Sequence, residues 1–140
     1  MADGISFDFS ELTALAADLG TVPDNAGPNV RKAVEFTSVE VKKAAAKKVS
    51  KRRHFRQAAS AIDFDVTAKA GATSSITSEI GYDKGRPSGK LGNLVEFGAP
   101  GSPNALTPGN ELVSSLHENE ADFQKGLERA LADAERKASL

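Results

Sequence analysis

The chain of 140 residues contains no cysteine and no tryptophan, with one tyrosine, one methionine and two histidines. Without cysteine, neither a disulfide framework nor a thiolate metal site can form, which excludes the small secreted folds that depend on disulfides. No apolar run approaches the ~20 residues that span a bilayer, and the N-terminus lacks the basic and apolar parts of a secretory signal. We therefore expect no membrane partner.

The supply of apolar side chains is small for the length of the chain. Hydrophobic residues make up 39% of the sequence. A chain of this length is most simply one domain, here residues 1–140, and it can bury a core. Part of the apolar surface of its helices is then available for neighbouring subunits.

Charge is unevenly distributed, although the net charge is only −1. Residues 1–41 hold seven acids and two bases, residues 42–56 hold eight bases and no acid, and residues 57–140 hold twelve acids and eight bases. Such a bipolar chain suits charged surfaces that meet other charged surfaces.

Helical spacing of apolar residues predicts N-terminal helices within residues 9–53: a short one over 9–19 and a long one over 28–53. Gly20 and Pro23 would stop the first. The same spacing predicts an amphipathic C-terminal helix over 111–137, capped by Asn110.

Between these helices, residues 61–98 are predicted to form a small antiparallel sheet. Ile62 begins an alternating strand, Ala70–Ala72 form a turn, and Thr73–Tyr82 form the second strand of a hairpin. A mobile loop over 83–93 leads to a third short strand, Leu94–Phe97. Residues 99–109 are expected to be irregular. The fold class is therefore α+β, with long helices packed on one face of the sheet.

No group of residues has the spacing of a catalytic, cofactor or metal site. Neither His54 nor His117 has a second ligand at a usual spacing, and the paired Asp63 and Asp65 on a polar strand face are expected to be solvated. We expect no enzyme activity, no metal and no cofactor.

The basic run is the main candidate surface. Its members are Lys42, Lys43, Lys47, Lys48, Lys51, Arg52, Arg53 and Arg56. Clustered bases can bind phosphates, but these wrap around more than one helical face and only Phe55 lies among them. A solvated helix end or a surface that docks on an acidic neighbour is the favoured interpretation, with direct DNA binding as the alternative.

A second candidate surface, for a subunit or partner, combines Glu96 and Phe97 with three bases of the preceding loop, Lys84, Arg86 and Lys90. Glu96 lies between two apolar residues. We expect its carboxylate to pair with a base of the basic run, in the same chain or in the next subunit.

The order of these elements resembles that of the tail-completion, or head–tail joining, proteins of long-tailed bacteriophages. The chain shares with them, in order, an N-terminal helix, a long Lys/Ala-rich helix, a small antiparallel sheet with a loop, a short strand in the run Leu94-Val95-Glu96-Phe97-Gly98, a Pro-rich segment and a closing helix. The resemblance covers nearly the whole chain.

The resemblance implies a virion structural protein at the head–tail junction, made in the cytoplasm of a bacterial host. Its copies would form a hexameric neck ring that joins tail to capsid and lets DNA pass, in transient contact with it. Neighbouring neck and tail proteins, such as a tail terminator and a head-side connector, would be its partners. The alternative is a small DNA-binding or packaging accessory protein that acts through residues 42–56.

Overall fold

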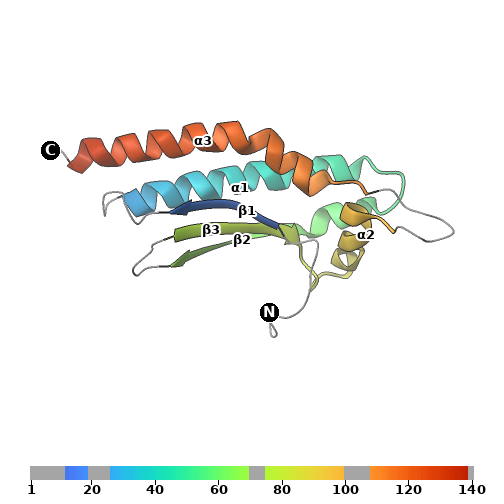
Figure 1. Ribbon diagram of the computed structural model, residues 1–140. Coiled ribbons are helices and arrows are strands. Elements are labelled where there is room, and N and C mark those ends of the chain that lie inside the picture. Colours follow the sequence, from blue (N-terminus) through green and yellow to red (C-terminus); the bar gives the residue numbers. More distant parts are fainter. Residues whose placement is uncertain (1–11, 19–25, 70–74, 100–107, 139–140) are drawn as a thin grey trace.

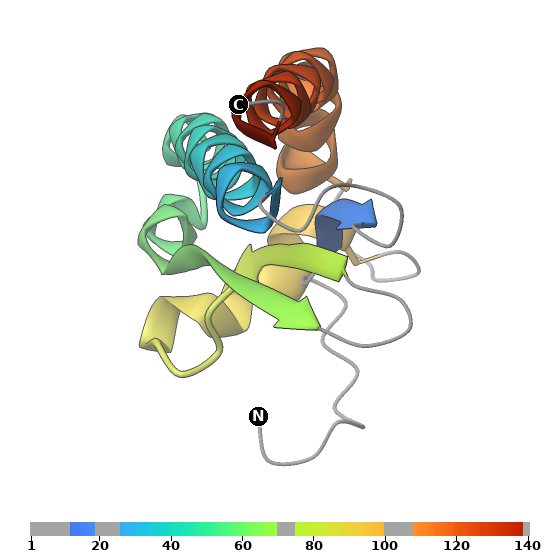
Figure 2. The same ribbon diagram turned by 90° about the vertical axis from the view of Figure 1, so that its left-hand side faces the viewer.

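The computed structural model describes residues 12–18, 26–69, 75–99 and 108–138. Two long helices lie on one face of a small antiparallel sheet, which confirms the predicted α+β class (Figures 1 and 2). The main elements are strands β1 (Leu12–Asp18), β2 (Ile62–Lys69) and β3 (Ser75–Tyr82), and helices α1 (Ala26–Ser50), α2 (Gly92–Phe97) and α3 (Glu111–Ala138). Two 3-10 helices, η1 (Arg56–Ala61) and η2 (Pro87–Leu91), connect them.

The sheet has the strand order β1-β3-β2, and both pairings are antiparallel. The hairpin of β2 and β3 is confirmed, with Ile62 opposite Tyr82 and Lys69 opposite Ser75. The turn predicted at 70–72 lies outside the described residues. Because β3 is central, both of its edges are paired. The helices cover one face of the sheet.

The prediction of a helix over residues 9–19 was wrong where the structure describes this segment, since 12–18 form the edge strand β1. A short apolar run fits either period, and seven residues are too few for helical propensity to decide. Pairing with β3 gives the backbone groups on one edge of the segment hydrogen-bond partners and places Leu15, 3% exposed, in the core. The register shifts between Thr13 and Leu15, which marks a bulge. Gly20 and Pro23 lie outside the described residues.

The long basic helix is confirmed as α1, although it begins at Ala26 and ends at Ser50, three residues before the predicted end. Its valines at positions 30, 34, 41 and 49 are buried against the sheet at the expected spacing. One polar link lies in this layer: Ser38 Oγ donates to Val34 O and shares a hydrogen bond with the Ser78 hydroxyl, each at 2.7 Å.

The predicted strand Leu94–Phe97 was wrong, because these residues belong to helix α2. The preceding segment is not an extended loop either: backbone hydrogen bonds from Arg86 N to Asp83 O and from Gly89 N to Arg86 O wind it into a turn and η2. The third strand of the sheet comes instead from β1. Four residues, three of them apolar, are compatible with either a strand or a single helical turn, so the local sequence did not determine the structure of this segment.

Helix α3 is confirmed within one residue of its predicted end and packs chiefly on α1, antiparallel to it. The core forms two clusters. One gathers Val41, Ala45, Val49, Ala58, Ala61, Ile62, Ile80, Tyr82, Val95 and Leu112. The other gathers Leu15, Ala26, Val30, Val34, Ile76, Phe123 and Ala134. Both lie between the helices and one face of the sheet, so charged residues concentrate on the outer sides of both layers.

Candidate functional site

The described residues contain no group of three or more acids or histidines that could hold a metal ion. His54 is exposed beside the ring of Phe55, and His117 Nδ1 lies 3.0 Å from Glu120 Oε1 on the outer side of α3. None of the described helices is both long and apolar enough to cross a bilayer. The features that remain are charged surfaces and a buried polar junction.

Three members of the basic run turn toward neighbouring elements and form ion pairs within the chain. Lys42 Nζ lies 3.2 Å from Asp63 Oδ1, and Lys48 Nζ lies 2.6 Å from Glu118 Oε1. Arg52 forms two hydrogen bonds with Glu111, and its side chain is only 19% exposed. These three bases tie α1 to the sheet and to α3, and their charges are compensated.

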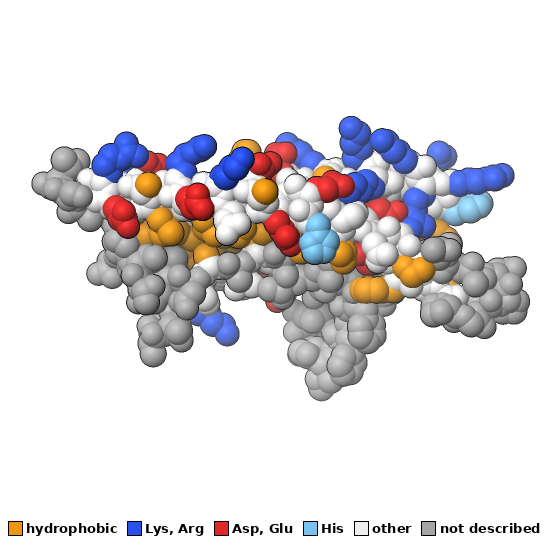
Figure 3. Space-filling view, turned by 45° about the horizontal axis from the view of Figure 1, so that its top comes forward, with side chains coloured by type: hydrophobic (Ala, Val, Ile, Leu, Met, Phe, Trp, Pro, Cys, Tyr) orange, Lys and Arg blue, Asp and Glu red, His pale blue; other side chains and the backbone are white. Residues whose placement is uncertain are grey.

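The remaining bases form an exposed surface, which we call the basic ridge: Lys43, Lys47, Lys51, Arg53 and Arg56. Lys43 and Lys47 are four residues apart, so they share one side of α1, and Lys51 lies in the turn directly after the helix. Lys43 has a single weak contact, 3.9 Å from Glu40, and the other four form no ion pair with any residue in the described ranges. In Figure 3, Lys and Arg side chains gather along the upper edge and at the right-hand end of the molecule.

Glu96 is fully buried, which corrects the expectation that it lies on a subunit surface. Its carboxylate accepts hydrogen bonds from the backbone amides of Leu112, at 2.9 Å, and Val113, at 3.3 Å. It therefore caps the N-terminus of α3, where free amides and the helix dipole favour an anion. Asn110, the predicted cap, supplies the carbonyl that accepts from Ser114 N, at 2.9 Å, while the capping carboxylate comes from α2.

Burial raises the pKa of Glu96 above its ordinary 4.5, against the opposing effect of the two amide hydrogen bonds. The expected partner, a base of the basic run, is present only as a neighbour. Arg52 instead donates hydrogen bonds to Glu111 and to the carbonyl oxygen of Val95, which lies 3.0 Å from its Nη2. Glu96, Arg52 and Glu111 together form a polar junction that joins α1, α2 and α3.

Two glycines make this junction possible. Gly98 ends α2 with φ 72° and ψ −166°, a conformation that is essentially restricted to glycine. Gly109 has no room for a side chain, since a Cβ there would lie 1.7 Å from Arg52 Nη2 and 2.7 Å from Val95 O. The Glu-Phe-Gly sequence thus has a structural use in this chain: the glutamate caps α3 and the glycine turns the chain away from α2.

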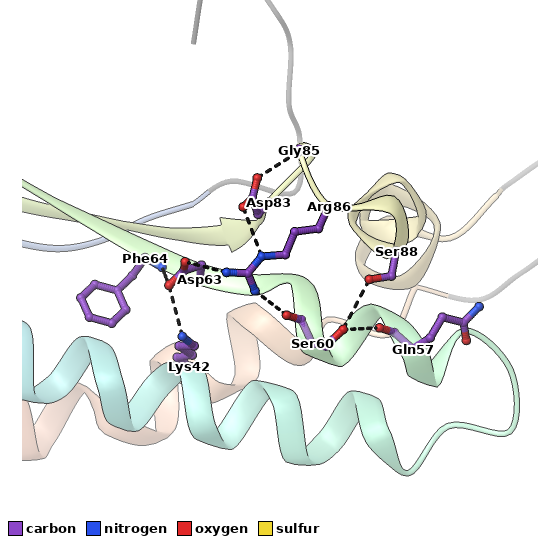
Figure 4. Close-up of polar contacts among 9 residues, drawn as sticks. All are labelled: Lys42, Gln57, Ser60, Asp63, Phe64, Asp83, Gly85, Arg86 and Ser88. Carbon is purple, nitrogen blue, oxygen red and sulfur yellow. Dashed lines mark hydrogen bonds and ion pairs between the residues drawn. The ribbon is translucent and has the colours of Figure 1, made fainter.

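A second polar network holds the segment after β3 against β2 and η1 (Figure 4). Arg86 donates to Ser60 O at 2.6 Å and lies 3.4 Å from carboxylate oxygens of both Asp63 and Asp83. Asp63 also accepts from Phe64 N at 2.9 Å and pairs with Lys42, and these contacts lower its pKa, the backbone hydrogen bond most. Arg86, a predicted partner residue, is thus engaged within its own chain.

Of the other predicted interface residues, Lys90 is exposed, Lys84 is partly buried, and Phe97 is 38% exposed on α2 beside Leu94, 37% exposed. These residues do not form one continuous surface with Glu96, because Glu96 lies inside the molecule.

The sequence did not single out the outer face of the sheet as a surface. This acidic face consists of Asp63, Asp65, Glu79 and Asp83, around a hollow of about 310 Å³. Asp65 and Glu79 stand directly opposite each other on β2 and β3, both exposed. Neither forms an ion pair with a residue of the described segments, and two like charges in this position repel each other. The alternation of β2 indicates a polar face in the sequence. Only the strand register shows that Asp65 and Glu79 stand opposite each other on it.

A groove of about 590 Å³ runs between α1 and α3. Its rim carries both signs of charge, from Lys32, Lys125 and Arg129 and from Asp122 and Asp133. Phe36, which is 69% exposed, also lines it and is the most exposed large apolar side chain among the described residues.

Comparison with known proteins gives no relative: no family model, no curated protein and no solved structure matches this chain.

Proposed function

We propose that the protein is a structural subunit of a long-tailed bacteriophage virion, a tail-completion or head–tail connector protein without catalytic activity. The observation that carries the proposal is the Glu-Phe-Gly junction. It is the most specific part of the resemblance, and in this chain it joins α2 to the closing helix through the carboxylate of Glu96. The long basic helix, the antiparallel hairpin and the closing helix support it by their order, whereas the N-terminal helix and the strand before Gly98 that the resemblance includes are strand β1 and helix α2 in this chain.

The surfaces support a role in assembly. A row of bases and a pair of acids that have no strong ion-pair partner among the described residues lie on the outside of the domain, together with the exposed Phe36. Such features are typical of surfaces that become buried between subunits, because aromatic anchors and complementary charges stabilise protein interfaces. In the proposed neck, copies form a hexameric ring between a tail terminator and a head-side connector, and DNA passes through it in transient contact.

Immunogold electron microscopy on purified particles tests this location. Particles and lysate of the source culture are labelled with antibody against this chain, and antibody against a major capsid protein serves as the control for access. We expect gold at the head–tail junction only. Label spread over the capsid, or protein found in the lysate but absent from particles, contradicts the neck role.

The basic ridge favours one further candidate, a DNA-binding or packaging accessory protein. Five bases that have no strong partner in the described part of the chain lie on one end of α1 and the segment that follows it, and clustered bases of this kind suit phosphate binding. This function predicts duplex binding that falls steeply with salt. A titration at several salt concentrations, repeated with the charge-reversing Lys43→Glu and Lys47→Glu double variant, distinguishes it: DNA binding that survives in that variant would not use the ridge.

A further inference from the structure

Two surfaces of opposite charge lie on opposite sides of the molecule. The basic ridge lies on the outer side of α1, whose buried valines face the sheet, and the acidic face lies on the side of the sheet turned away from the helices. Figure 2 shows this layering in an end view, with the helices above and the strands below. Among the described residues, Lys42 reaches Asp63 at the edge of the sheet, but no base of the ridge pairs with an acid of this face within one chain.

We propose that the acidic face of one copy binds the basic ridge of a second copy, so that the protein associates head to tail. The interface deepens the proposed assembly function and rests on it only in requiring that copies of the chain meet. Contacts of this kind join two different surfaces, and they repeat until a ring closes or a filament grows.

The acidic face has an uncompensated centre. Asp63 pairs with Lys42 and Arg86, and Asp83 pairs with Arg86. Two bases therefore balance these two acids within the chain. Asp65 and Glu79 have no such partner among the described residues, although they stand opposite each other in the register. A cation brought by another molecule would relieve their repulsion, and it would reach them without rearrangement, because both side chains are exposed.

The basic ridge has lysines whose spacing matches that of the two acids. The exposed Lys43 and Lys47 project from one side of α1, about 6 Å apart along its axis, and Lys51 follows directly after the last residue of the helix. Strand neighbours across β2 and β3 have a similar spacing, ~5 Å. Lys43 and Lys47 can therefore approach the Asp65–Glu79 pair together. Phe36, two helical turns before Lys43, adds an exposed aromatic ring to the same side of α1.

A complementary charge exchange tests the interface. One variant carries Asp65→Lys and Glu79→Lys, and the other carries Lys43→Glu and Lys47→Glu. All four positions are exposed, and circular dichroism checks that each variant is folded. Sedimentation velocity over a range of concentrations, at low and high salt, measures association. A variant with Lys90→Glu and Lys137→Glu, two exposed lysines outside both surfaces, is the control for the net charge of the Lys43→Glu and Lys47→Glu variant.

We expect the wild type to associate as its concentration rises and to dissociate in high salt. Each exchanged variant alone should associate at least roughly tenfold more weakly, because the four residues proposed to meet then carry the same sign. A mixture of the two should regain association, since each supplies the surface that the other has lost. The control should behave as the wild type does.

Three results overturn the proposal: a wild type that stays monomeric at every concentration, an exchanged variant that associates as the wild type does, or a mixture that stays monomeric. If an exchanged variant does not fold, Asp65→Asn with Glu79→Gln replaces it. This neutral pair removes the repulsion, so it should weaken association several-fold and leave the monomer at least as stable. Unchanged association in this variant also overturns the interface. Gold label away from the neck would contradict the proposed location without affecting these results.

Discussion

The two sides of α1 carry the same residue types but differ in what surrounds them. On the sides facing the sheet and α3, Lys42, Lys48 and Arg52 each meet a carboxylate within hydrogen-bonding distance. On the outer side, Lys47 and Lys51 meet no partner in the described chain. One continuous basic run therefore contains both structural charges and free ones. A count of bases in the sequence does not separate them, whereas the effects of single substitutions should.

Replacement of Arg52 should cause the largest loss. Arg52→Ala leaves Glu111, whose side chain is only 10% exposed, without its partner, and it frees the carbonyl of Val95. Breaking a buried pair costs roughly 3–5 kcal/mol, so we expect about 2–4 kcal/mol at this partly exposed site. Urea unfolding measures it. Lys51→Ala is the control, and equal losses in the two variants would contradict the distinction between the two sides.

Removal of the Glu96 carboxylate should cost somewhat less. Glu96→Ala deletes the cap of α3 and leaves a space in the core, for which we expect a loss of about 2–3 kcal/mol in the free energy of unfolding. Glu118→Ala, an exposed acid on the same helix, provides the comparison. A Glu96→Ala protein as stable as the wild type would mean that α3 does not depend on α2 for its cap.

A side chain at Gly98 should destabilise the turn after α2. Gly98→Ala forces an L residue to adopt φ 72° with ψ −166°, which costs about 1–3 kcal/mol. Gly126→Ala is a matched control, because a Cβ there would meet only Ala33 Cβ at an ordinary 3.9 Å. Thermal unfolding of the two variants compares them directly. If Gly98→Ala melts no earlier than the wild type, the turn has another geometry in solution.

The buried carboxylate of Glu96 should also change the dependence of stability on pH. Burial raises its pKa in the folded protein above the ordinary 4.5, so its contribution to stability is fully present below about pH 4.5 and is lost as pH rises through the folded pKa. Glu96→Gln cannot titrate. The stability of the wild type relative to this variant should therefore fall as pH rises from about 4.5 through the raised pKa of the folded protein, in chemical unfolding experiments. A constant difference would show that the carboxylate keeps its ordinary pKa on folding.

The smallest effects on stability should come from the basic ridge. Lys47→Ala removes an exposed charge without a described partner, and we expect a change within about 0.5 kcal/mol. The same substitution should weaken the proposed head-to-tail association. Chemical unfolding together with sedimentation at low salt measures both. A large loss of stability would place Lys47 among the structural charges with Arg52.

Long periodic segments of the sequence determined the framework of the fold. The valine spacing of α1, the apolar stripe of α3 and the alternation in β2 each extend over enough residues to define a period, and all three elements formed as predicted, within a few residues at their ends. The basic run was also visible, because composition alone reveals it. The α+β class follows from these elements.

Tertiary structure decided the short apolar segments and the use of each charge. Residues 12–18 became a strand because β3 offered a free edge, and residues 94–97 became helical at the junction where Glu96 caps α3. Neither run is long enough for its own periodicity to prevail. In the same way, Lys and Arg look alike along the chain, and only the packing of α1 against the sheet and α3 determines which ones find a carboxylate. The local sequence pattern determines the period of a long segment. The strand and ion-pair partners, which come from distant parts of the chain, are determined only by how the helices pack on the sheet.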